Sequence, residues 1–172
     1  MNWDAIGAIG EILGAAAVVV SLVYLSVQIK QNSNWLKATV FESAGNRSGE
    51  MISLVVGDAE LSRLVQMGIA GKTNEMTPEE KHRYCLLMQK AFRSNEVAFN
   101  HHKSGLLDSK NYEGIVANLS VWLHSDLFDT WWENIHPMFN PEFVEMVNSL
   151  KIHREPISYD WFETDPANSE ET

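Results

Sequence analysis

The chain is poor in the residues that build covalent frameworks or break helices. Cys85 is the only cysteine among 172 residues, so no intramolecular disulfide and no zinc site built on cysteine pairs can form. There are five prolines, and the first of them is Pro78, which leaves a long stretch free of the strongest helix breaker. A chain of this length makes one ordinary domain, or one small domain with an appendage.

Basic residues are scarce as well. Lys and Arg number 13 against 23 Asp and Glu, for a formal net charge of -10. A protein that binds nucleic acid through its phosphates needs a basic face, so we expect no nucleic-acid partner. Residues 68–73 read GIAGKT, but they lack the earlier glycine of a P-loop and follow a helical pattern where that motif requires a strand.

Charge is almost absent from the segment Ala5–Ile29, where Glu11 is the one ionisable residue. As a helix, this segment spans roughly 37 Å, enough for a hydrocarbon core of about 30 Å. Trp3 lies on one side and Tyr24 and Trp35 on the other, as interfacial aromatic residues do. We predict an uncleaved transmembrane helix. The alternatives are a helix buried in a soluble oligomer and a cleaved signal peptide.

The flanking charges predict the orientation of this helix. Asp4 precedes it without any Lys or Arg, whereas Lys30, Lys37 and Arg47 follow it. Positive residues stay on the cytoplasmic side, so we expect a single pass with the N-terminus outside and the C-terminal domain in the cytoplasm. An unpaired Cys85 fits that reducing compartment.

Small residues recur along the same helix at spacings of three and four. We call this set the membrane stripe: Gly7, Gly10, Gly14, Ala17 and Ser21. Such a pattern puts the small residues on one side, where two membrane helices can approach closely. It predicts a homo-oligomer that associates through this stripe. The alternative is a monomeric anchor that merely contains glycine.

Glu11 borders the membrane stripe and is an unusual residue for a membrane segment. A carboxylate there costs about 2.5 kcal/mol or more, and such groups usually face a bundle interior or water. In an oligomer it would lie near the axis. Alternatively, the helix begins at Glu11, whose carboxylate would then stabilise the first turn at the interface.

The rest of the chain shows helical periodicity and no long alternating stretch. We expect the membrane helix to continue to Gly57, with a relaxed turn at residues 32–34, and further helices to start at the caps Asp58, Thr77, Asp108, Ser125 and Asn140. The strongest start signal is Thr77-Pro78-Glu79-Glu80, which has the residues of a capping box and a proline at the first helical position. The predicted fold is all-α: a transmembrane helix that continues into a cytoplasmic bundle of about five to six helices.

We divide the chain into a membrane anchor (1–31), a helical domain (32–154) and an acidic, flexible tail (155–172). The end of the chain, EPISYDWFETDPANSEET, has six acidic residues, two prolines and no basic residue. Tyr159, Trp161 and Phe162 would make a docking peptide for a cytoplasmic protein partner. The alternative is that these aromatic side chains fold back onto the domain.

Candidate catalytic and metal-binding residues are few. Glu96 and His101 are five residues apart, whereas helical metal sites use spacings of three or four. The pattern puts Cys85 on an apolar helix face, which favours a buried structural thiol. Trp122 and Trp131 could line a ligand pocket, but such residues more often form a core. We therefore expect a non-enzymatic protein with no cofactor and no metal.

Several segments together resemble an uncharacterised family of small bacterial single-pass membrane proteins. They are GEILGAAAVVVSLVYLSVQIKQNSN (10–34), DAELSRLVQMGI (58–69), LMQKAFRSNEVAF (87–99), SGLLD (104–108), WW (131–132) and FNPEFVEMV (139–147). The resemblance implies a bacterial inner-membrane location and a helical domain after the anchor. It carries over no catalytic residue.

Three functions are compatible with these features. The first is a membrane-anchored protein that self-associates and presents a cytoplasmic domain to a partner. The second is an oligomeric ion channel or transporter-like assembly with Glu11 near its axis, although the surrounding valines and leucines leave few polar pore-lining positions. The third is a ligand-binding or enzymatic domain that uses Trp122 and Trp131 with His101 or His102. Neither the partner nor the number of copies follows from the sequence.

Overall fold

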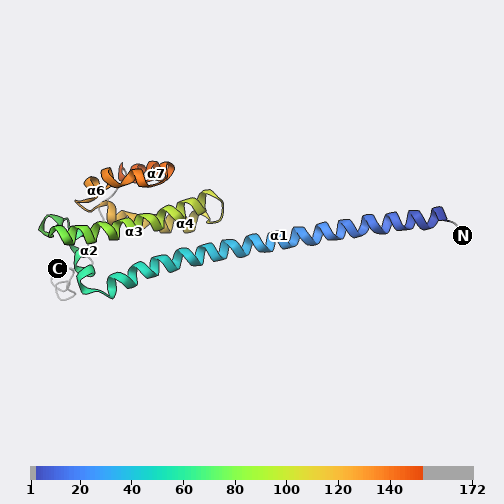
Figure 1. The fold of residues 1–172 in the computed structure, drawn as a ribbon, viewed down its shortest axis with the longest axis horizontal. Helices are drawn as coiled ribbons and strands as arrows, with labels where there is room; N and C mark the ends of the chain where they lie inside the picture. The colour runs from blue at the N-terminus through green and yellow to red at the C-terminus, as the bar shows by residue number, and fades with distance from the viewer. Residues whose placement is uncertain (1–2, 153–172) are drawn as a thin grey trace, which may run out of the picture. The chain divides into compact units, whose positions relative to one another are not determined.

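A computed structural model of the protein describes residues 3–152, and this part of the chain is all-α, without a β-strand. A long N-terminal helix, α1, runs from Trp3 to Val56, and a helical domain follows it (Figure 1). The further helices are α2 (Ala59–Ile69), α3 (Pro78–Lys103), α4 (Ser109–Ala117), α5 (Leu119–Leu123), α6 (Phe128–Ile135) and α7 (Pro141–Ile152), with 3₁₀ turns η1 (Thr73–Glu75) and η2 (His136–Met138). The predicted fold class is confirmed.

The continuity of α1 differs from expectation. It remains α-helical through residues 32–34, where we expected a relaxed turn. Each asparagine and serine there carries only a weak helix penalty, and no proline or glycine interrupts this part of the helix. The chain divides into two compact units after Glu42, inside α1.

The capping residues fold as the sequence predicts. Asp58 accepts hydrogen bonds from the backbone N–H groups of Glu60 and Leu61, at 2.9 and 3.1 Å. At the start of α3, the Thr77 hydroxyl accepts from the Glu80 N–H at 3.3 Å, and the Glu80 carboxylate accepts from the Thr77 N–H at 2.7 Å. This reciprocal pair is the predicted capping box, and it fixes the start of the longest helix in the domain.

Later in the chain, two expected helix starts are confirmed and two expectations are wrong. Ser125 does not cap a helix: α6 begins at Phe128, and its N-cap, Leu127, makes no side-chain capping hydrogen bond. Asp108 caps α4 by accepting from the Asn111 N–H at 3.0 Å, and Asn140 accepts from the Glu142 N–H at 2.9 Å as α7 begins. Between the expected starts at Asp108 and Ser125 the chain forms two helices, α4 and α5, which are split at Asn118, where the caps predicted one. The split lets Leu119 and the next turn enter the core, whereas α4 has no fully buried side chain.

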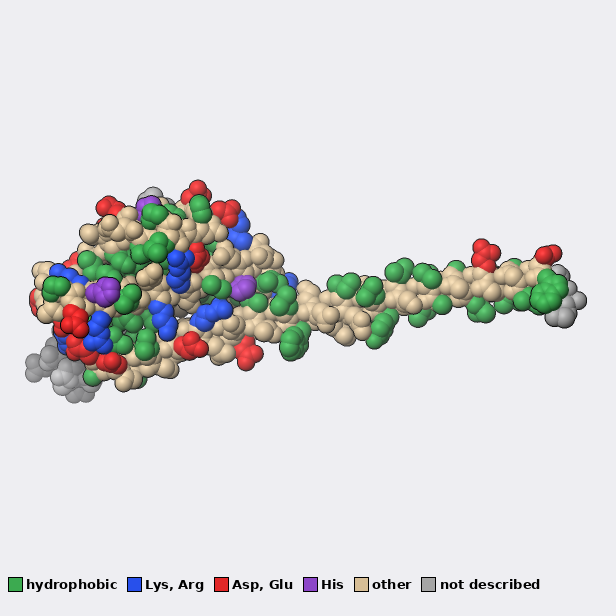
Figure 2. All heavy atoms as spheres, viewed as in Figure 1, with side chains coloured by type: hydrophobic (Ala, Val, Ile, Leu, Met, Phe, Trp, Pro, Cys, Tyr) green, Lys and Arg blue, Asp and Glu red, His purple; other side chains and the backbone are tan. Residues whose placement is uncertain are grey.

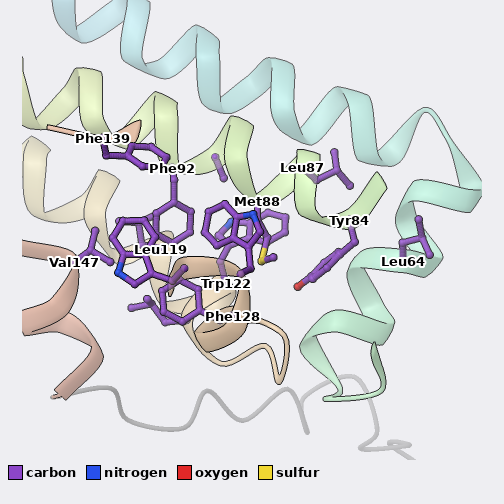
Figure 3. Close-up of a cluster of buried hydrophobic side chains, with 14 of the residues drawn as sticks. Leu64, Tyr84, Leu87, Met88, Phe92, Leu119, Trp122, Phe128, Phe139 and Val147 are labelled. Carbon is purple, nitrogen blue, oxygen red and sulfur yellow. The ribbon is translucent and has the colours of Figure 1, made fainter. Parts of the chain in front are cut away.

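Aromatic rings of α3 and α6 form the centre of the core. Phe92 is fully buried, and its ring centroid lies 5.6 Å from Phe128, 5.1 Å from Trp131 and 5.4 Å from Trp132. Figure 3 shows Phe92 and Phe128 among these buried side chains. The burial of aromatic and other apolar side chains accounts for most of the favourable free energy of folding of a small domain.

Gly68 has a role that the sequence analysis missed. It lies within α2 and is buried against Tyr84 of α3. A Cβ atom at this position would overlap the Tyr84 ring. The turn that ends α2 is made by Gly71, whose φ of 65° is in the left-handed region that favours glycine.

Candidate functional site in the N-terminal helix

The first half of α1 exposes apolar side chains on every side. Twelve aliphatic residues between Ile6 and Ile29 are each at least 49% exposed, and none of the most apolar window is buried. In Figure 2 hydrophobic side chains project from both edges of this helix. Within the described chain, α1 is the one helix long and apolar enough to cross a membrane.

The membrane stripe forms one open side of this helix. At 100° per residue its five positions fall within roughly 80° of one another. A Cβ atom placed on Gly7, Gly10 or Gly14 would meet no atom within 4 Å. The Ser21 hydroxyl donates to the Ala17 carbonyl at 2.8 Å, so it is satisfied within the helix and lies flat against it. The stripe therefore offers a shallow, uncharged surface to another helix.

Glu11 lies two turns inside α1. The helix begins at Trp3, and Asp4 occupies its first turn, so the alternative in which the helix begins at Glu11 is wrong. The Glu11 side chain is exposed in the single chain. Its position at the edge of the membrane stripe follows from the helix geometry, because it is roughly 40° from Gly7 and 60° from Gly14.

Two polar side chains that the sequence analysis did not assign to the membrane stripe, Tyr24 and Gln28, continue on the same side of the helix. The Gln28 side-chain amide donates to the Tyr24 hydroxyl at 2.8 Å, one turn apart. Both side chains are exposed. Gln28 lies seven residues after Ser21, and Tyr24 lies seven residues after Ala17. This spacing in the sequence could have shown that both residues continue the membrane stripe. Polar side chains in such positions form hydrogen bonds between membrane helices.

His102 and Glu96 of α3 make contacts within the fold of the domain. The Glu96 carboxylate accepts from the Asn140 N–H at 2.6 Å and pairs with Arg93 at 2.8 Å. Arg93 also donates to the Met138 carbonyl at 2.7 Å. His102 has its Nδ1 3.0 Å from the Leu107 carbonyl oxygen. These contacts hold the loop after α3 and the start of α7.

The remaining candidates for chemistry are also parts of the packed domain. Trp122 and Trp131 lie in the hydrophobic core, where Trp122 packs against Tyr84 at 5.8 Å. Cys85 is half-buried, and burial raises the pKa of its thiol, which disfavours the reactive thiolate. In residues 3–152 no group of three or more His, Cys, Asp or Glu side chains could hold a metal ion.

Two expectations are not tested by these residues. Tyr159, Trp161 and Phe162 lie outside the described part of the chain. Comparison with protein-family models, with curated proteins and with solved structures gave no match, so the resemblance to a family of bacterial membrane proteins stays a prediction.

Proposed function

We propose that this protein is a single-pass membrane protein that self-associates through the membrane stripe and presents its helical domain to a cytoplasmic partner. The observation that carries the proposal is the exposure of twelve aliphatic side chains along Ile6–Ile29. No part of the described chain covers them, so a lipid bilayer or other copies of the chain must do so.

The energetics favour lipid. At the centre of a membrane helix, each Leu, Ile or Val contributes about 0.3–0.6 kcal/mol to insertion, so twelve contribute roughly 4–7 kcal/mol. The cost of Glu11 is about 2.5 kcal/mol at the bilayer centre and less near an interface. The aliphatic residues therefore outweigh the carboxylate.

The length and continuity of α1 support an anchor that is retained. The segment Ile6–Ile29 is roughly 36 Å long, against about 30 Å of hydrocarbon. The helix then continues without a break to Val56. A signal peptidase would cut an extended chain just after the apolar segment, but here those residues are helical.

We propose that the membrane is a bacterial inner membrane, and the charge distribution supports a cytoplasmic location for the domain. Lys30 and Lys37 follow the apolar segment directly and Arg47 lies further along α1, whereas Asp4 is the only charged residue before the apolar segment. The positive-inside rule places the domain with the lysines.

Substitutions on the two sides of the helix test the proposal. Gly10→Leu and Gly14→Leu add bulk to the membrane stripe, and Val19→Leu enlarges a side chain on the opposite side as a control. We expect each glycine variant to weaken association at least about tenfold, which corresponds to about 1.4 kcal/mol, and the control to leave it unchanged. The measurements are sedimentation in mild detergent and a two-hybrid assay in bacterial membranes.

Two results would refute the proposal. One is a monomeric wild-type protein in both assays. The other is association that Gly10→Leu, Gly14→Leu and Val19→Leu leave equally intact, because a contact through the membrane stripe cannot tolerate leucine in place of its glycines.

A further inference from the structure

Two lysines follow the apolar segment of α1 without an acidic residue nearby to balance them. Lys30 comes directly after Ile29, and Lys37 lies about two turns further along the helix. Residues 12–41 contain no Asp or Glu, although the whole chain has a formal net charge of -10. The residues three and four positions from each lysine, which are its neighbours on the helix surface, are uncharged. The two lysines therefore form a local positive charge in an acidic protein.

Both lysines lie on the same side of the helix as Asn34. At 100° per residue, Lys30, Asn34 and Lys37 fall within roughly 60° of one another. All three side chains are exposed, and neither lysine forms an ion pair with any of the described residues. We call these three residues the lysine site. Its two ammonium groups and one amide are hydrogen-bond donors of the kind that bind an anion.

The place of the lysine site along α1 sets its depth in the membrane. If the apolar segment fills the hydrocarbon core, as proposed above, Lys30 lies at the cytoplasmic boundary of that core. The headgroup region beyond this boundary is about 5–7 Å thick in each leaflet. Lys37 is roughly 10 Å further along the helix, but side chains of a helix point back toward its N-terminus, which here means toward the bilayer. The long stem of lysine then brings the ammonium group to the level of the headgroups.

Trp35 supports this depth. Its side chain is 76% exposed, and it lies between the two lysines in the sequence. An indole ring in water lacks the apolar contacts that it makes when buried. At the headgroup level, its apolar body and its polar N–H group both find partners. The segment 30–37 thus combines the residue types that hold a helix at a membrane interface.

We propose that the lysine site binds the phosphate group of an anionic phospholipid in the cytoplasmic leaflet. The inference rests on the single-pass anchor proposed above and names a ligand for it. A lipid is the occupant that the position favours, because lipid phosphates lie at the depth of Lys30 and carry the charge that two ammonium groups attract. Asn34 would donate a further hydrogen bond from its side-chain amide.

Lipid titration of the purified full chain tests the proposal. Phosphatidylglycerol and phosphatidylcholine with the same acyl chains are added separately to the protein in a mild non-ionic detergent, and native mass spectrometry counts the lipids bound. Each lysine near an anionic surface contributes about fivefold to binding, which corresponds to about 1 kcal/mol. For two lysines we expect the wild type to bind phosphatidylglycerol about 25-fold more tightly than phosphatidylcholine.

Three double variants separate the lysine site from a general effect of charge. Lys30→Gln/Lys37→Gln should bind the two lipids about equally, whereas Lys30→Arg/Lys37→Arg should keep the preference because both charges remain. The control, Lys72→Gln/Lys110→Gln, removes the same number of charges from exposed positions in the helical domain and should leave the preference unchanged. Glutamine has nearly the helix propensity of lysine, so the loss expected in the first variant does not come from unfolding of α1.

Free glycerol phosphate distinguishes a lipid ligand from a soluble anion. It carries a phosphate group without the acyl chains that would hold this group at the depth of the lysine site. We expect it not to displace bound phosphatidylglycerol at an equal concentration. Displacement would identify the ligand as a soluble anion and would overturn the assignment to lipid.

The outcomes separate this inference from the proposed function. Equal binding of the two lipids by the wild type would overturn the inference, and so would a loss of preference in the control as large as in Lys30→Gln/Lys37→Gln. The proposed function survives either result if the chain stays in washed membranes and associates through Gly10 and Gly14. A chain that is soluble without detergent would overturn the proposed function and this inference with it.

Discussion

Two glycine-to-alanine substitutions should change the stability of the domain in opposite directions. Gly68 lies inside α2 and Gly114 inside α4. Helix propensity alone predicts that alanine stabilises both helices by about 0.5–1 kcal/mol. The surroundings differ, because a Cβ atom at Gly114 meets nothing within 4 Å, whereas one at Gly68 overlaps the Tyr84 ring.

The Tyr84 ring cannot move away at low cost. The side chain is fully buried, its ring centroid lies 5.8 Å from that of Trp122, and Figure 3 shows it on the side of the core toward Leu64. Overpacking of a core costs about 1–3 kcal/mol, which exceeds the propensity gain. We therefore expect Gly68→Ala to lower the free energy of unfolding by about 1–2 kcal/mol.

Thermal unfolding in mild detergent, followed by tryptophan fluorescence, measures both effects. For a domain of about 100 residues, we expect the Tm to fall by about 5–10 °C in Gly68→Ala and to rise by about 2–5 °C in Gly114→Ala. In a Tyr84→Leu background the Gly68→Ala substitution should lose most of its cost, because the overlapping ring atoms are gone. A Gly68→Ala variant as stable as Gly114→Ala would refute the packing of α2 on α3.

Two further predictions concern the core and the capping box. Phe92→Ala should destabilise the domain by about 3–5 kcal/mol because its ring contacts are lost. Leu86→Ala, at a 51% exposed position of the same helix, is the control and should cost less than about 1 kcal/mol. Urea unfolding measures both variants, and similar urea midpoints for the two would contradict this prediction. Hydrogen bonds from Thr77 and then Arg63 lower the pKa of the Glu80 carboxyl. Ionised Glu80 thus stabilises the fold above its usual pKa of about 4.3, and this contribution is lost as the pH falls through the lowered folded-state value. The stability difference between wild type and Glu80→Gln should therefore shrink from pH 6 to pH 3, and a constant difference would contradict the assignment.

Local signals in the sequence predict most of the helix boundaries. Asp58, Thr77 and Asp108 each bind the backbone N–H groups that their positions require, because capping depends on residues within three positions. The break at Asn118 was not predictable in the same way. It depends on which turns enter the core, and Asn118 itself carries no strong breaking signal.

The candidate site was predicted unevenly. The apolar segment and the membrane stripe follow from composition and spacing, which are properties of one helix. The side of α1 that the domain covers was not predictable, because residues 43–56 carry apolar side chains on two sides of the helix. Only the packing of Met51 against the core leaves Ile52 on the open side.

Fractionation of bacterial cells that express the full chain, with an alkaline carbonate wash of the membranes, tests the central claim most directly. If lipid covers the apolar half of α1, the protein stays in the washed membrane pellet and is released only by detergent. Recovery of a monodisperse protein from the supernatant without detergent would contradict the account.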